Sequence, residues 1–261
     1  MNFQSCQYIR ELPDLSITSP NIKQLNLHEW IKLVKVHNSD GCLDKLESWD
    51  LMGCIELQII PSFIMMKLLK FLILYECKRV EWFPDILEEM ENLKFLSLAY
   101  TAIRVLTSSF GNLVGIVQLD IGSYIYSCHL PSSMYKLQYL RKLILHGHVQ
   151  FPKDVKIGRQ VLCNSYGYFS KYDFLTLNFL KNLTSCFNLL EKCLLLGSEN
   201  LNFQDGIMRF NGLNFLLIED CKFFKKIPKA SRKYKICVCI KLHLVEFTII
   251  KKIIPSRTPL S

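Results

Sequence analysis

Hydrophobic residues recur along this chain in one pattern, Leu-x-x-Leu-x-Leu-x-x followed by a small polar residue. Successive copies begin 23 or 24 residues apart. The copies start at Ile22, Leu46, Leu69, Leu93, Ile116 and Leu140, and the pattern returns at Leu190 and Leu213. A fixed period of this length is typical of a solenoid, in which every repeat forms one coil of a stack.

The spacing inside each copy predicts a strand. In x-Leu-x-Leu-x the two leucines point to one side of an extended chain and the x positions to the other. We expect strands within 22–27, 46–51, 69–74, 93–98, 116–121 and 140–145, parallel and side by side. One coil cannot bury its leucines alone, so stacking is required. The sequence therefore predicts an α/β fold. It is a leucine-rich-repeat solenoid (horseshoe) with a parallel sheet on the concave face and irregular or short helical segments on the convex face.

The pattern divides the chain into four segments. Residues 1–154 and 186–229 carry the repeats, 155–185 fit no repeat and are expected to be an irregular insertion or a degenerate repeat, and 230–261 form a basic, apolar C-terminal tail. Cys6, Ile9, Leu12 and Pro13 match the second half of a copy whose start is missing. We therefore expect a truncated protein that begins within a repeat.

The net charge of +9 comes from the tail. Residues 222–261 contain eleven basic side chains and one acidic side chain, so the rest of the chain is nearly neutral. A basic end of this kind is usually solvated, and we expect no nucleic-acid partner. Charges interrupt the most apolar stretch, 236–254, which excludes a membrane span. Eleven cysteines without a secretory signal indicate reduced thiols in the cytoplasm, or in the nucleus.

Residues with catalytic, cofactor-binding or metal-binding spacing are not found. None of the glycines lies in a phosphate-binding G-x-x-x-x-G-K-[ST] frame. His146, His148, Cys128 and His129 lack the spacing of metal ligands, and ordinary solvent-exposed or turn residues are the favoured interpretation. The sequence therefore predicts no enzyme, no cofactor and no metal site.

Several repeat variants resemble one family. They are LSLAYTAI at 96–103, LTSSFGNL at 106–113, LPSSM at 130–134 and CKFFKKIP at 221–228. These are similar to the leucine-rich-repeat region of plant intracellular nucleotide-binding disease resistance proteins of the Toll/interleukin-1-receptor-type class. Thr107 stands where that family usually has proline. The resemblance implies a recognition module of an innate immune receptor. Such a module senses a pathogen effector or a guarded host protein and, in the full receptor, contacts and restrains the nucleotide-binding domain.

The predicted partner-binding surface is the outward row of the strands. Phe71, Ile73, Tyr75, Phe95 and Tyr100 fall on two adjacent coils, and a cluster of exposed aromatic residues is typical of a protein-binding hot spot. A covering loop, or a register shift of one residue, is the alternative interpretation. An extracellular receptor platform or a ubiquitin-ligase substrate adaptor remains the alternative function for the same fold.

Overall fold

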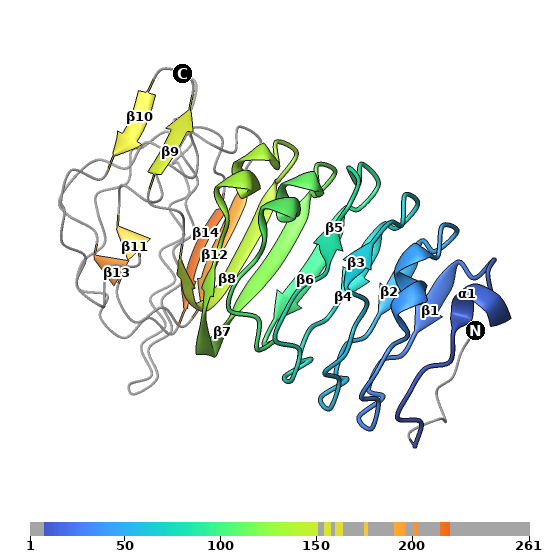
Figure 1. The fold of residues 1–261 in the computed structure, drawn as a ribbon. Coiled ribbons are helices and arrows are strands. Elements are labelled where there is room, and N and C mark those ends of the chain that lie inside the picture. Colours follow the sequence, from blue (N-terminus) through green and yellow to red (C-terminus); the bar gives the residue numbers. More distant parts are fainter. Residues whose placement is uncertain are drawn as a thin grey trace, which may run out of the picture.

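The computed structural model describes residues 8–150, 154–157, 160–163, 175–176, 191–196, 201–202 and 215–219. Its main element is an eight-stranded sheet in the order β1-β2-β4-β6-β7-β8-β12-β14, in which every neighbouring pair is parallel (Figure 1). The strands are β1 (Gln24–Asn26), β2 (Ser48–Asp50), β4 (Phe71–Ile73), β6 (Phe95–Ala99), β7 (Gln118–His129), β8 (Lys142–Gln150), β12 (Lys192–Leu196) and β14 (Phe215–Glu219). The prediction of neighbouring parallel strands is confirmed.

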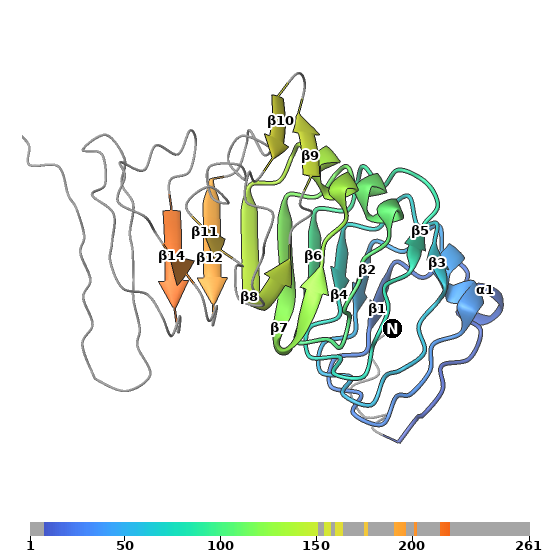
Figure 2. The same cartoon turned by 60° about the vertical axis from the view of Figure 1, so that its left-hand side comes forward.

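Short turns and bridges return each coil on the side away from the sheet (Figure 2). They comprise α1 (Leu15–Thr18), the 3-10 turns η1 (Asn38–Cys42), η2 (Ser108–Asn112) and η3 (Ser132–Lys136), and the parallel pair β3 (Phe63–Ile64) and β5 (Asp85–Ile86). The turns η2 and η3 contain the Ser-Ser pairs of the LTSSFGNL and LPSSM variants. The predicted mixture of irregular and short helical segments is therefore present, with a short strand pair in addition.

The core is a ladder of inward side chains, one from each coil. The register places in line Leu25, Trp49, Leu72, Leu96, Leu119, Leu143 and Cys193. All of them are buried, with at most 2% of their surface exposed. Fully burying a leucine stabilises the fold by about 1.5–3 kcal/mol. The solenoid is thus stable only as a stack, because each ladder residue is covered by the coil beside it.

Side chains at the small polar position that follows the strands donate hydrogen bonds to backbone carbonyl groups. The thiol of Cys54 donates to the carbonyl oxygen of Leu27 at 3.2 Å, and that of Cys77 donates to Leu51 at 3.1 Å. Thr101 donates to a carbonyl within its own coil at 2.8 Å. These side chains satisfy carbonyl groups at the turn, as a buried backbone requires.

The chain leaves the main sheet after β8 and rejoins it at β12, which pairs directly with β8. Between them lie the antiparallel pair β9 (Asp154–Ile157) and β10 (Gln160–Cys163), and β11 (Leu175–Thr176), which pairs in parallel with β13 (Leu201–Asn202). The expected tail at 230–261 lies outside the described residues. Within the part of the chain that the structure describes, no helix is long and apolar enough to cross a membrane.

Candidate protein-binding face of the sheet

The five residues predicted as a partner-binding patch lie on two neighbouring coils. Phe71 and Ile73 belong to β4, Phe95 belongs to β6, and Tyr75 and Tyr100 follow the ends of those strands. Phe71 is the register partner of Phe95, and the rings of Tyr75 and Tyr100 meet edge to face with centroids 5.1 Å apart. Phe71 is 46% exposed, whereas the other four are half-buried. The five residues are thus brought together on two coils but are less exposed than the sequence suggests, and their binding role stays a prediction.

Tyr100 lies at a position where four successive coils have a left-handed backbone conformation. Glu29, Gly53, Glu76 and Tyr100 occupy the same place in successive coils, with φ of 58, 73, 62 and 60°. Each N–H there donates to a carbonyl of the next coil, as Tyr100 does to Gly122 at 2.9 Å. A bulky residue in this conformation costs on the order of 1 kcal/mol. The interactions between coils therefore hold Tyr100 in place against its local backbone preference.

Four aromatic side chains gather just beyond the ends of β4 and β6 and, on the next two coils, within β7 and β8, and we name them the Tyr–His cluster: Tyr75, Tyr100, Tyr124 and His146. Tyr100 is central, with its centroid 5.1 Å from Tyr75, 5.5 Å from Tyr124 and 4.7 Å from His146. The rings are tilted by 82°, 53° and 56°, orientations that aromatic pairs favour. Tyr124 is 47% exposed, whereas His146 is buried.

A chain of buried polar groups lies beneath these rings. The hydroxyl of Ser97 donates to Asp120 Oδ2 at 3.0 Å, and His146 Nε2 lies 2.8 Å from Asp120 Oδ1. His146 Nδ1 lies 3.0 Å from the hydroxyl of Tyr100. One arrangement satisfies every contact: His146 donates from Nε2 to the carboxylate and accepts from Tyr100 at Nδ1. The chain therefore fixes the orientation of the His146 ring and, through it, that of Tyr100.

The tyrosine hydroxyls of this cluster are hydrogen-bonding groups rather than nucleophiles. Burial raises the pKa of Tyr75, and the negative charges of Glu76 and Asp120 raise it further. Burial also raises the pKa of Tyr100, and a side-chain hydrogen bond with Tyr124 raises it further. Both phenols thus stay protonated at neutral pH. The site presents ring surface and hydroxyl groups, which is the chemistry of an interaction surface.

Sequence reasoning missed three members of this site. Asp120 and His146 belong to the outward row, but the repeat pattern assigns neither of them to the partner-binding patch, and it predicts that His146 is exposed or at a turn. The structure corrects this expectation, because His146 is 6% exposed and paired with Asp120. Tyr124 lies where β7 continues beyond the usual strand length, so the repeat pattern assigned it no place. The available signal was a carboxylate and an imidazole on adjacent coils of the same face.

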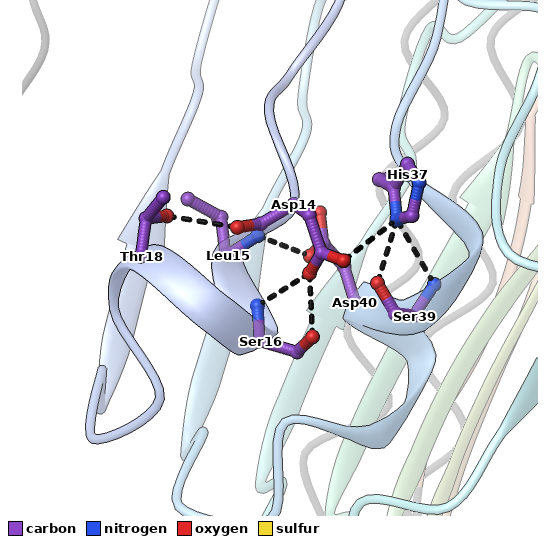
Figure 3. Close-up of polar contacts among 7 residues, drawn as sticks. All are labelled: Asp14, Leu15, Ser16, Thr18, His37, Ser39 and Asp40. Carbon is purple, nitrogen blue, oxygen red and sulfur yellow. Dashed lines mark hydrogen bonds and ion pairs between the residues drawn. The ribbon is translucent and has the colours of Figure 1, made fainter.

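A second polar cluster lies on the opposite side of the coils, around α1 and η1 (Figure 3). Asp14 caps α1 by accepting from the N–H of Ser16 at 2.9 Å, and Asp40 Oδ1 accepts from the N–H of Leu15 at 2.8 Å. His37 Nδ1 lies 3.5 Å from Asp14 Oδ2. Asp40 is fully buried, and burial raises its pKa to about 6. These contacts attach α1 to the next coil.

Among the described residues, no group of three or more histidine, cysteine or carboxylate side chains is arranged to hold a metal ion. The described cysteines form no disulfide. Burial raises the pKa of Cys54, Cys128 and Cys193 to about 12 and that of Cys77 further still. These thiols are unreactive core residues, because the thiolate is the nucleophilic form.

Residues that are paired on neighbouring strands lie 24 positions apart in the sequence from β1 to β2 and 23 positions apart from β2 to β4. This repeat length, with one inward ladder residue per coil, defines a leucine-rich-repeat protein. A family model described as "Disease resistance protein RPS4B-like, leucine-rich repeats" matches residues 65–255. This match covers more than half of the chain, which therefore belongs to that family.

Two curated relatives come from Arabidopsis thaliana. The protein SUPPRESSOR OF npr1-1, CONSTITUTIVE 1 is 34% identical over 113 residues, which cover 43% of this chain and 8% of the relative. The disease resistance protein RPP2A is 35% identical over 114 residues, again 43% of this chain and 8% of the relative. The chain thus spans less than a tenth of their length. A solved leucine-rich-repeat protein of Leptospira interrogans aligns with 90% of this chain and 76% of its own, at 13% identity and a TM-score of 0.31.

Proposed function

We propose that this chain is the protein-recognition module of a plant innate immune receptor and senses a pathogen effector or a guarded host protein. Membership of a family named for disease resistance supports the immune role. The repeat architecture supports recognition, because a stack of coils offers a long side-chain surface without needing a catalytic centre. In the full receptor, the module contacts the nucleotide-binding domain and restrains its switch.

The proposed compartment is the cytoplasm, or the nucleus. Cys42, Cys54, Cys77, Cys128 and Cys193 are free thiols, and the last four are buried in the core. Disulfides are rare in these two compartments, and a core that uses single cysteines as small apolar residues fits a reducing environment.

The observation that carries this proposal is the aromatic row across β4 and β6. Phe71 and Phe95 are paired in register, so they occupy neighbouring positions on strands about 4.8 Å apart. Tyr75 and Tyr100 continue the same surface at the other end of these strands. Aromatic residues bury large areas while losing few rotamers, so they supply most of the binding energy in many protein interfaces. A partner that covers these rings displaces water from aromatic surface.

The test is alanine substitution of Phe71 and Phe95 together. The chain is first screened against a panel of purified effectors and candidate host proteins, and the dissociation constant of the partner found is measured. Phe71→Ala with Phe95→Ala should weaken binding by about 2 kcal/mol or more. The melting temperature should change little, because Phe71 is exposed and Phe95 is half-buried.

Replacing the lysines of 222–261 with glutamine is the matched control. These substitutions should change the association rate and the salt dependence but leave affinity at physiological salt nearly unchanged. If the alanine pair binds like the wild type while the glutamine variant loses the partner, the sheet face is not the recognition site.

A further inference from the structure

Charge is unevenly distributed along the strands of the sheet face. At the N-terminal ends of β1, β2, β4, β6, β7 and β8, the charged side chains at the last loop residue and the first strand position are basic with one acidic exception, Glu47. The basic ones are Lys23, Lys70, Lys94, Arg141 and Lys142. From the middle of the same strands to the left-handed residue, the fully charged side chains are all acidic: Asp50, Asp120, Glu29 and Glu76. The face therefore has a basic edge and an acidic edge.

The acidic edge contains carboxylates that remain available to a partner. Glu29 has 77% of its side-chain surface exposed, and Asp50 and Glu76 are half-buried. Asp50 accepts the N–H of Met52, and Glu29 Oε1 lies 3.7 Å from His28 Nε2. Within the described residues no lysine or arginine is recorded in an ion pair with Glu29, Asp50 or Glu76. At the basic edge, by contrast, Lys70 is paired with Glu47 at 2.6 Å.

The Tyr–His cluster lies at the same acidic edge. Glu76 directly follows Tyr75, and the N–H of Glu76 donates to the carbonyl of Ala99, next to Tyr100. The face of a phenol ring attracts a cation, and arginine is the side chain most often found there. The negative charges that raise the pKa of Tyr75 favour a cation at the same place. Exposed Tyr124 provides a ring that a partner can reach without opening the core.

We propose that the acidic edge of the sheet face binds a basic segment of the partner protein, with an arginine or lysine side chain on the Tyr–His cluster and its charge balanced by Glu76 and Asp50. The inference rests on the proposed recognition function and specifies the chemistry of its partner. A partner oriented in this way places its positive segment at the C-terminal ends of the strands. Its acidic or neutral groups then face the lysines at the other edge, so charge fixes the direction of docking.

The direct test is a peptide titration of the full chain. The probe is a fluorescein-labelled nine-residue peptide that repeats Gly-Ser-Arg. The matched probe has citrulline, a neutral isostere, in place of arginine, and a third peptide has glutamate. We expect the arginine peptide to bind at least tenfold more tightly than the citrulline peptide and to weaken with added salt. Equal binding of the arginine and citrulline peptides would overturn the proposal.

Substitutions at the two edges locate the binding. Tyr124→Ala and Glu76→Gln should each weaken the arginine peptide at least threefold, whereas Lys94→Gln at the opposite edge should not weaken it. Neither Tyr124 nor Glu76 is a core residue, so both variants should fold. Unchanged melting temperatures would confirm this. If both variants bind the peptide like the wild type, the site lies elsewhere and the inference is wrong.

Three further outcomes bear on this inference, and the last two of them separate it from the proposed function. If the arginine peptide binds only after the lysines of 222–261 are replaced with glutamine, the chain's own basic residues are the occupant and the inference is overturned. If the peptides bind without charge preference while the Phe71→Ala and Phe95→Ala pair still loses the partner protein, the recognition function stands and the basic-segment inference fails. If charge preference holds and the alanine pair has no effect, the recognition site is the acidic edge and not the phenylalanine row.

Discussion

An aspartate faces a histidine on each side of the coils, and the two pairs differ in burial and in role. On the sheet face, Asp120 and His146 lie 2.8 Å apart with 11% and 7% of their side chains exposed. On the opposite side, Asp14 and His37 lie 3.5 Å apart with 24% and 45% exposed. The first pair supports the ring of Tyr100, whereas the second lies beside a helix cap.

The difference shows that the surroundings, and not the residue types, decide what such a pair does. An exposed ion pair contributes between zero and about 1 kcal/mol, because water screens it. A buried pair costs desolvation to form, and losing one partner then leaves the other without its hydrogen bond. The Asp120–His146 pair is therefore expected to determine the geometry of the sheet face. The Asp14–His37 pair is expected to act mainly through the cap that Asp14 makes.

Substituting Asp120 should give the largest effect. Asp120→Ala removes the acceptor of both Ser97 and His146, two buried side chains, so the free energy of unfolding should fall by about 3 kcal/mol. Urea denaturation at pH 7 measures it. Ser97→Ala, which removes one of the two contacts, should cost about 1 kcal/mol. A loss below 1 kcal/mol for Asp120→Ala would show that the buried pair is no more important than the exposed one.

Much of the fold follows from the sequence, because one inward residue per coil repeats with a fixed period. Leu72 and Leu96 are 24 residues apart in the chain and are partners in the sheet, as the repeat predicts. The same register places Phe71 beside Phe95. Tyr124 was not predictable in this way, because β7 runs on to His129 and its pairing with β8 shifts register between Ser123 and Cys128. That irregular stretch, which the repeat does not encode, brings Tyr124 against Tyr100.

Asp40 should make the stability of the second polar cluster depend on pH. Its pKa is about 6 in the folded chain against an ordinary value of 3.8, so the folded state binds the proton more tightly than the unfolded state. Stability should therefore rise as the pH falls from 7 to 5, by about 1 kcal/mol. Urea denaturation at the two pH values measures this gain.

The control for that prediction is Asp40→Asn, which cannot titrate. The difference between wild type and variant in stability change from pH 7 to pH 5 isolates Asp40 from the histidines. The pKa of Asp14 is lowered, chiefly by the side-chain hydrogen bond from Ser16, so its stabilising contribution is lost only below about pH 3.8. An identical pH profile for wild type and Asp40→Asn would refute the assignment.

Removing the N-cap of α1 should lower the free energy of unfolding by about as much as the change expected from Asp40, or by less. Asp14→Ala leaves the N–H of Ser16 without its acceptor, and loss of an N-cap costs about 1 kcal/mol. Asp14→Ser retains a capping oxygen and should recover most of that loss. If serine is as destabilising as alanine, the charge of Asp14 matters more than its hydrogen bond to the helix.

His37 should give the smallest effect and the clearest contrast with His146. The His37 side chain is 45% exposed, and its ion pair with Asp14 exists only when the imidazole carries a proton. His37→Gln should therefore lower the free energy of unfolding by about 0.3 kcal/mol at low salt, and the loss should disappear in 0.5 M NaCl. The cost of Asp120→Ala should persist in the same salt, because solvent ions do not reach a buried pair. If added salt relieved both losses equally, burial would not explain the difference between the two pairs, and the orientation of Tyr100 would need another cause.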